Sequence, residues 1–220
     1  MSAPPLRIAH RGMPRRLREN TLPSFAAAIA AGAQGIELDV HATADDVVVV
    51  HHDAILRGSE IRRTQWSALS ARELAAGVRA PTLREVCQLV SGSVELFVEV
   101  KGAGIEVLVV EAMKDYEGTA AIHSFDHAMI GRLARLDVPH RLGLLFEDDA
   151  THARNSMREL GALDVWPHHS LVTERLIDDV HAAGGRVIPW TVNDAVLARG
   201  LASLGVDGLC TDDVTILDAV

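Results

Sequence analysis

Short apolar segments alternate with helix-like segments along nearly all of this chain, and this alternation limits its possible folds more than any other feature. Eight segments have the length and apolar character of buried strands: Leu6–His10, Gly35–Val40, Val94–Lys101, Ala120–Ser124, Arg141–Phe146, Leu163–Pro167, Arg186–Val192 and Gly208–Thr211. The segments between them read as helices: Leu22–Ala31, Leu83–Val90, Ile105–Tyr116, Ala128–Leu136, Ala150–Leu160, Glu174–Ala183 and Ala195–Leu204. Strands that alternate with helices form parallel sheets with right-handed crossovers.

Eight such strands in 220 residues predict an α/β fold, a (β/α)8 TIM barrel at the small end of its size range. A doubly wound open sheet is the alternative. No repeat, low-complexity segment or linker divides the sequence, so we expect one barrel domain over residues 1–220. The first helix has a clear start, because Asn20 and Thr21 can cap it and Pro23 suits its opening turn.

The segment Val47–His52 is a further apolar strand, and no helix precedes it. We therefore expect it to be the return arm of a hairpin that projects after the second strand. A tight turn centred on residues 45–46 would place Asp39 opposite His52, with their Cβ atoms roughly 5 Å apart. Strand alternation then brings Glu37, Asp39 and His52 to one face.

Polar side chains gather at the C-terminal ends of the predicted strands. These ends read His10-Arg11-Gly12, Glu37-Leu38-Asp39, Glu99-Val100-Lys101, Ser124-Phe125-Asp126, Trp166-Pro167-His168, Trp190-Thr191-Val192-Asn193 and Thr211-Asp212-Asp213. A barrel presents all these ends at one mouth, where barrel enzymes have their active sites. Chance placement would scatter polar groups over both ends, so the pattern predicts an active site at this mouth.

Glu37, Asp39 and Glu99 would bring three carboxylates to the mouth. An oxygen-only set of ligands suits Ca²⁺ or Mg²⁺, and crowded carboxylates repel one another unless positive charge balances them. His10 and His52 are expected beside this set. Imidazole transfers protons near neutral pH, so the pair predicts general acid/base catalysis, with the acid and the base left unassigned.

Arg11 and Lys101 add fixed positive charge to the same mouth. An anionic substrate held by a divalent cation, an arginine and a lysine, beside two histidines, indicates a phosphate ester. The sequence thus predicts phosphate-ester chemistry on a small-molecule substrate.

The motifs that carry these residues resemble those of the glycerophosphodiester phosphodiesterase family. The matching stretches are His-Arg-Gly at 10–12, Glu-Asn-Thr at 19–21, Ile-Glu-Leu-Asp-Val at 36–40, His-Asp at 52–53, Val-Glu-Val-Lys at 98–101, Ser-Phe-Asp at 124–126, Trp-Thr-Val-Asn at 190–193 and Gly-Val-Asp-Gly-Leu-Cys-Thr-Asp at 205–212. They occur in the family's order over nearly the whole chain, which makes the resemblance highly specific.

The resemblance implies a barrel that hydrolyses glycerophosphodiesters to glycerol phosphate and an alcohol. It assigns acid/base catalysis to the residues at His10 and His52 and contacts with phosphate to those at Arg11 and Lys101. The metal ligands that it implies are Glu37, Asp39 and Glu99. Two other readings are a related phosphodiesterase of lipid diesters, of the lysophospholipase D or phospholipase C type, and a non-catalytic phosphodiester-binding barrel.

The sequence departs from the family pattern in two places. Arg18 stands where the family usually has proline, and the insertion between His52 and Pro81 is short. The family often has a cap over the glycerol side of the pocket here, so a short insertion predicts a more open pocket. Arg15, Arg16 and Arg18 are either extra anion contacts or a solvated basic loop.

Several residues near the predicted mouth have two readings. Trp190 either walls the pocket or closes the barrel core, and His168 is a candidate substrate contact at the end of the sixth strand. We expect His123 to pack in the core and His41 to be exposed to solvent. Asn20 reads first as a helix cap.

The bulk properties exclude some partners. A formal charge of −9 at pH 7 argues against a nucleic-acid surface, which needs clustered lysine and arginine. No run of 18 or more apolar residues predicts membrane insertion, and no apolar signal segment precedes the first strand. The two cysteines sit in apolar runs and are expected to be reduced. We therefore expect a cytoplasmic protein.

Overall fold

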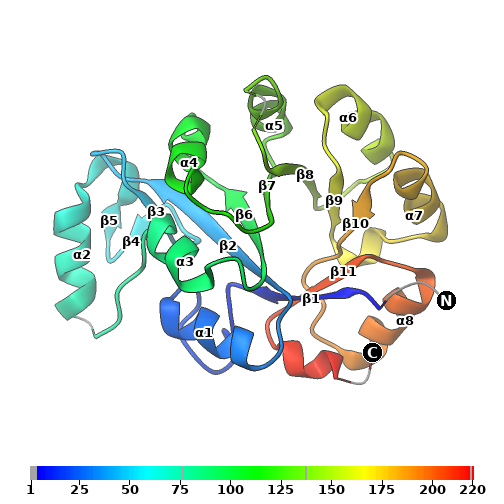
Figure 1. Ribbon diagram of the computed structural model, residues 1–220, viewed down its shortest axis with the longest axis horizontal. Coiled ribbons are helices and arrows are strands. Elements are labelled where there is room, and N and C mark those ends of the chain that lie inside the picture. Colours follow the sequence, from blue (N-terminus) through cyan, green and yellow to red (C-terminus); the bar gives the residue numbers. More distant parts are fainter. Residues whose placement is uncertain (1–3, 76, 137, 219) are drawn as a thin grey trace.

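The computed structural model describes residues 4–75, 77–136, 138–218 and 220. Within these ranges eight parallel strands form a nearly closed barrel with helices around it, which confirms the predicted TIM barrel (Figure 1). The barrel strands are β1 (Leu6–His10), β2 (Gly35–Ala42), β6 (Glu95–Val100), β7 (Ala120–Ser124), β8 (Arg141–Phe146), β9 (Asp164–Pro167), β10 (Arg186–Val187) and β11 (Gly208–Thr211). Their order around the sheet is β10-β9-β8-β7-β6-β2-β1-β11.

The seam between β10 and β11 is closed by backbone hydrogen bonds. The amide of Asp207 donates to the carbonyl oxygen of Val187 over 2.9 Å, and that of Cys210 donates to Pro189 over 3.1 Å. β10 is shorter than the predicted strand to Val192, although the amides of Ile188 and Trp190 still donate to the carbonyl oxygens of Val165 and Pro167 in β9.

Helices cover the outside of the barrel, and most of them follow the predicted segments. They are α1 (Leu22–Ala30), α3 (Leu83–Val90), α4 (Glu106–Met113), α5 (His127–Ala134), α6 (Ala153–Leu160), α7 (Glu174–His181) and α8 (Ala195–Leu204), with 3-10 turns η1 (Ile61–Arg63), η2 (His169–Leu171) and η3 (Val214–Leu217). In α3, Thr82 and Glu85 form a capping box, and Leu83, Val86 and Val90 turn inward. None of the described helices is long and apolar enough to cross a membrane.

The predicted hairpin is present, but its register differs from the prediction. β3 (Val48–Val50) pairs antiparallel with β2, and Val40 lies opposite Val50. The turn is one residue longer than expected, because the Thr43 amide donates to the Val47 carbonyl oxygen and Asp46 takes a positive φ of 61°. The amide of His51, not that of His52, therefore donates to the Asp39 carbonyl oxygen.

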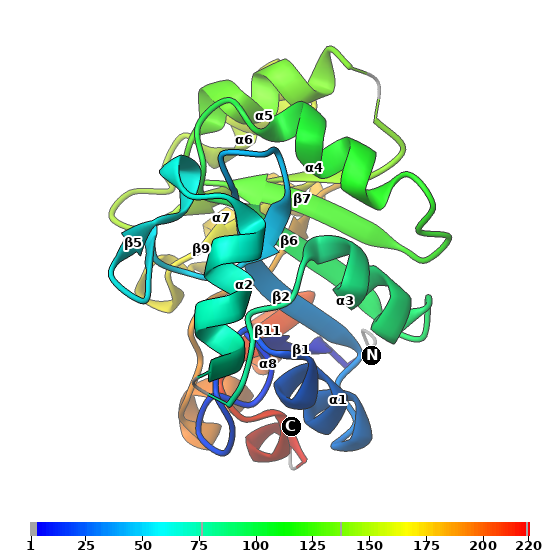
Figure 2. The same ribbon diagram turned by 90° about the vertical axis from the view of Figure 1, so that its left-hand side faces the viewer.

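An insertion follows the hairpin, as predicted, and it contains a helix that the sequence reading missed. It comprises β4 (Ile55–Leu56), β5 (Ser59–Glu60), η1 and α2 (Trp66–Ala75). Figure 2 shows α2 in front of the barrel strands on this side of the molecule. A small apolar cluster joins Val49 of β3 to Leu56, Ile61, Leu69 and Ala80 of the insertion and the segment after it.

The apolar core has an outer and an inner part. The outer part lies between the strands and the helices, and the inner part fills the barrel with Ile8, Phe97, Ala121, Leu145, Trp166, Ile188 and Cys210. Gly35 leaves the space that the Phe97 ring needs, because a Cβ there would come within 2.6 Å of that ring. The barrel is thus a packed core with room for polar groups only at its ends.

Charged side chains fill the N-terminal end of the barrel. Arg186 donates to both carboxylate oxygens of Glu95, at 3.0 and 2.8 Å, and to Asp164 at 2.7 and 2.9 Å. Arg141 also donates to Asp164, at 2.8 Å. Asp164 is fully buried, and these donors satisfy both of its oxygens.

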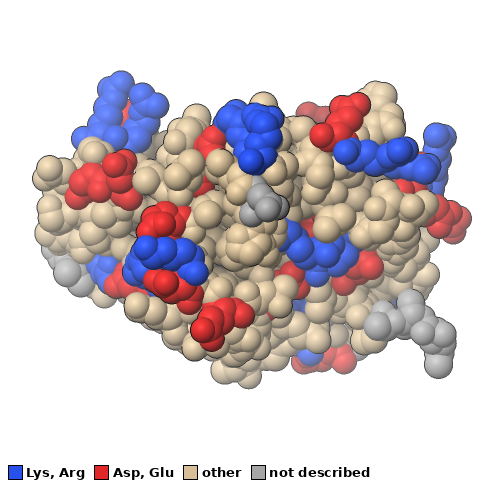
Figure 3. Space-filling model, turned by 45° about the horizontal axis from the view of Figure 1, so that its top comes forward, with Lys and Arg blue, Asp and Glu red and all other residues tan. Residues whose placement is uncertain are grey.

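Basic and acidic groups also alternate on the outer surface. On the face in Figure 3, lysine and arginine side chains stand beside aspartate and glutamate. Arg154, for example, pairs with Asp179 at 3.2 Å. Such surface pairs contribute little to stability.

Substitution of Asp164 by alanine is expected to lower the free energy of unfolding by about 3–5 kcal/mol, because it removes a fully buried carboxylate that pairs with both Arg186 and Arg141. Denaturant unfolding followed by circular dichroism measures this. Asp178→Ala on the exposed face of α7 is the control, with an expected change within about 0.5 kcal/mol. Equal effects of both substitutions would show that the charged end of the barrel does not contribute to stability.

Candidate active site

A cavity of about 290 Å³ lies at the C-terminal mouth of the barrel. It is lined by most of the predicted site residues: His10, Arg11, Glu37, His52, Glu99, Lys101 and Trp190. Asp39 lies directly behind this lining and is fully buried. His168 is not in the lining, but its ring meets the Trp190 ring edge-on, with centroids 5.6 Å apart.

Two neighbouring strands place the three carboxylates together. β2 and β6 pair in parallel with Asp39 opposite Glu99, and strand alternation puts Glu37 on the same face as Asp39. All three residues are less than a tenth exposed. Burial, together with the charge of Asp39, raises the pKa of Glu99 to about 7 and raises the pKa of Glu37 well above its usual value.

Asp39 has two basic partners, Arg11 and Lys101, and Lys101 also donates to Glu99 over 2.6 Å. Burial alone would raise its pKa, but Arg11 at 3.0 Å and Lys101 at 3.2 Å lower it overall. Asn20 donates to the same carboxylate over 2.8 Å. Asn20 is therefore not a helix cap, as we expected, but a support of the site.

A histidine that the sequence reading placed in the core joins the other two carboxylates. His123 on β7 is only 1% exposed and stacks on Trp166, with ring centroids 4.5 Å apart. Ligand atoms of Glu37, Glu99 and His123 lie within 4.8 Å of one another. Burial keeps the pKa values of Glu37 and Glu99 raised even though Lys101 donates to Glu99 over 2.6 Å, so the residues fit a divalent cation.

Each predicted catalytic histidine is held by a carboxylate at Nδ1. His10 Nδ1 lies 2.7 Å from Asp212 Oδ1, and Asn193 donates to the other oxygen of Asp212 over 2.7 Å. His52 Nδ1 lies 2.8 Å from Asp53 Oδ1. An ionised carboxylate can only accept, so Nδ1 carries the hydrogen in both rings and Nε2 is left for the substrate.

His41 also supports His52, although we expected it to be exposed. It is 9% exposed, and its Nε2 donates to the carbonyl oxygen of His52 over 3.0 Å. β3 ends at Val50, so His52 is positioned by this contact and not by strand pairing.

Comparisons with known proteins agree on one family. The model of the glycerophosphoryl diester phosphodiesterase family matches residues 10–216. This chain belongs to the glycerophosphodiester phosphodiesterase family. A glycerophosphodiester phosphodiesterase of Caldanaerobacter subterraneus is 31% identical over 228 aligned positions, which cover 94% of this chain and 93% of the relative.

Solved structures of the family have the same fold as this phosphodiesterase. A phosphodiesterase of Oleispira antarctica, in complex with the product sn-glycerol-3-phosphate, has a TM-score of 0.87 and 25% identity, and the match covers 98% of this chain and 96% of that one. A glycerophosphodiester phosphodiesterase of Thermotoga maritima has a TM-score of 0.84 and 26% identity, with 98% of both chains covered.

The arginines that depart from the family pattern have structural partners in this phosphodiesterase. Arg18 pairs at 2.7 Å with Glu73 of α2, which is fully buried, and Arg16 pairs at 3.1 Å with Asp213. Arg15 donates over 3.4 Å to the backbone of Asn193. The solvated-loop reading is therefore wrong for Arg18, and none of the three arginines lines the cavity.

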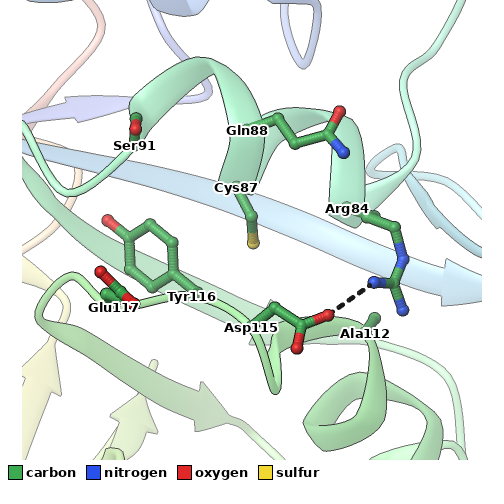
Figure 4. Close-up of a pocket in the computed structure, with 8 residues that line it drawn as sticks. All are labelled: Arg84, Cys87, Gln88, Ser91, Ala112, Asp115, Tyr116 and Glu117. Atoms are coloured by element: carbon green, nitrogen blue, oxygen red, sulfur yellow. Dashed lines mark hydrogen bonds and ion pairs between the residues drawn. The ribbon is translucent and has the colours of Figure 1, made fainter.

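A larger cavity, of about 350 Å³, lies between α3 and α4 and lacks comparable chemistry (Figure 4). Its Arg84 and Asp115 neutralise each other at 3.2 Å. Burial raises the pKa of its Cys87 thiol to about 11, so this thiol stays protonated at neutral pH. The reactive groups of the phosphodiesterase gather in the cavity at the barrel mouth.

Cation binding is expected to release more protons at pH 6 than at pH 8, because Glu99, with a pKa of about 7, and Glu37, whose pKa burial also raises, must both ionise to act as ligands. Titration calorimetry with Mn²⁺, in buffers of different ionisation enthalpy, measures the proton count. The affinity should rise with pH through this range. Equal proton release at both pH values would show that Glu99 is already ionised at pH 6.

Proposed function

We propose that this phosphodiesterase hydrolyses glycerophosphodiesters to glycerol phosphate and an alcohol, with a divalent cation at the mouth and with His10 and His52 as the acid/base pair. The observation that carries the proposal is the arrangement of two carboxylate-held histidines around a buried carboxylate cluster. The product complex of the Oleispira antarctica relative, with sn-glycerol-3-phosphate, supports the identity of the phosphate product.

The carboxylates and the basic residues of the cavity have separate roles in the proposed hydrolysis. A bound cation would polarise the phosphoryl oxygens and offset their charge; Glu37 and Glu99 would hold it, and Asp39 lies beside them as the third carboxylate expected from the family. The carboxylates alone suit Ca²⁺ or Mg²⁺. Arg11 and Lys101 contribute fixed positive charge where negative charge grows at phosphorus.

The two imidazoles transfer the protons. One Nε2 with a free lone pair takes the proton from the attacking oxygen, which is water or a glycerol hydroxyl, and the other Nε2 gives a proton to the leaving oxygen. Asp212 and Asp53 keep both rings oriented and stabilise whichever ring becomes charged.

Apolar groups complete the wall of the cavity. Phe125 is 42% exposed and meets Trp190 edge-on, with centroids 5.6 Å apart, and Leu145 lies in the same lining. These groups suit the carbon skeleton of the glycerol or of the alcohol. Trp190 therefore serves as a pocket wall in the proposed function, and His168 supports it from behind.

The proposed activity is tested by release of glycerol phosphate from glycerophosphocholine, glycerophosphoethanolamine and glycerophosphoglycerol. Each is incubated with Ca²⁺, Mg²⁺, Mn²⁺ or a chelator. Cation-dependent release from any of them is expected. Turnover of lysophosphatidylcholine micelles alone would favour the lipid-diester alternative, and binding of the diesters without any release would favour a non-catalytic barrel.

Substitution of His10 or His52 by alanine is expected to lower kcat by about 10²–10⁴-fold, the contribution typical of a general acid or base. Circular dichroism should show an intact fold. The exposed His152→Ala is the matched control and should retain full activity. Near-normal turnover by either active-site variant would remove that histidine from the mechanism.

Asp212→Asn is expected to lower kcat by roughly 10²-fold or more, because an amide no longer fixes the hydrogen on His10 Nδ1. The pH profile of kcat should change as well, which a purely structural role would not cause. Asp213→Asn is the neighbouring control, since its carboxylate contacts Arg16 and Thr215. An unchanged pH profile in Asp212→Asn would refute the positioning role.

A further inference from the structure

The imidazole of His123 faces the carboxylates of the proposed cation site. His123 lies opposite Glu99 in the pairing of β7 with β6. Its Nε2 is 3.9 Å from Glu37 Oε1, and it belongs to the group whose ligand atoms fall within 4.8 Å. A single ion could therefore contact all three side chains.

The ring has no hydrogen-bond partner of its own. Within the described part of the chain, Nδ1 is buried without a partner, and Nε2 approaches only the carboxylate. Leaving a buried polar group unpaired is destabilising. Coordination of a cation through one nitrogen would offset part of this cost.

The surroundings fix the ring and keep it neutral. Its stacking on Trp166 is nearly parallel, at 17°, and Gly143 leaves the space for both rings, since a Cβ there would lie 3.0 Å from His123 Cβ. Burial lowers the pKa of His123 to about 3, so the ring needs no deprotonation to act as a ligand.

We propose that His123 is a direct ligand of the divalent cation, together with Glu37 and Glu99, and that it makes this site prefer Mn²⁺, Co²⁺ or Zn²⁺ to Ca²⁺ and Mg²⁺. Oxygen ligands alone suit Ca²⁺ and Mg²⁺, whereas a neutral imidazole binds first-row transition ions better. Asp39 lies beside this group, where Arg11, Lys101 and Asn20 contact its carboxylate. The inference rests on the proposed function only in placing a cation at this mouth.

Pulsed electron paramagnetic resonance of the Mn²⁺-loaded protein tests the nitrogen ligand without any assay of turnover. The wild type is expected to show modulation from a directly bound ¹⁴N nucleus, and His123→Asn is expected to lose it. His168→Asn, at the same end of the barrel, is the matched control and should keep it. Absence of the ¹⁴N signal in the wild type would overturn the proposal even if His123→Asn did not fold.

Calorimetry tests the metal preference. His123→Asn offers an oxygen in place of the nitrogen. The ratio of the Kd for Mg²⁺ to the Kd for Mn²⁺ should therefore fall at least about tenfold. Loss of a residue that only hydrogen-bonds to a metal ligand already weakens metal binding by this amount. An unchanged ratio, or a ¹⁴N signal that persists in folded His123→Asn, would assign the nitrogen to another histidine and refute the proposal.

The same preparations separate this inference from the proposed function. If the ¹⁴N signal depends on His123 but no glycerophosphodiester is cleaved, the ligand assignment stands and the proposed activity falls. If the diesters are cleaved and no nitrogen binds the ion, the activity stands and the role of His123 falls.

Discussion

The site depends on keeping several carboxylates buried side by side. β2 and β6 hold Glu37, Asp39 and Glu99 on one face, and their mutual repulsion limits what can surround them. Arg11 and Lys101 pair with Asp39, and Lys101 also pairs with Glu99. Burial still raises the pKa values of Glu37 and Glu99, and these carboxylates are the groups that gain most from an added positive ion.

The second constraint is the orientation of the two histidines. Each reaches the cavity from a different element, His10 from the end of β1 and His52 from beyond the hairpin. In both cases a neighbouring acid holds Nδ1 and leaves Nε2 toward the cavity. The barrel strand supports His10 directly, whereas His52 relies on the buried His41 and on the turn at Thr43. The two histidines are thus held by different parts of the fold, yet both present Nε2 to the cavity for proton transfer.

The sequence allowed the barrel and most of the site to be predicted, because both follow simple periodicities. Strand alternation and strand ends located His10, Arg11, Glu37, Glu99 and Lys101 at the cavity. The prediction failed where side-chain hydrogen bonds determine the backbone conformation. The Thr43 hydrogen bonds lengthened the turn and changed the hairpin register, and His52 lines the cavity only because β3 stops early. His123 packs on Trp166, as predicted, but it also lines the cavity and faces Glu37, which strand alternation alone could not show.

The insertion has a consequence for how this barrel could be changed. Its apolar cluster is separate from the barrel core, and Glu73 anchors it through Arg18 of the loop after β1, with Arg57 on its other oxygen at 2.7 Å. The insertion is therefore joined to the barrel by this buried ion pair, by the packing of Val49 of β3 in the same cluster, and by the hydrogen bond from the Trp66 amide to Asp45 in the hairpin turn. A recombinant barrel with a different insertion would need a new acid in place of Glu73, because Glu73 is the carboxylate that pairs with Arg18.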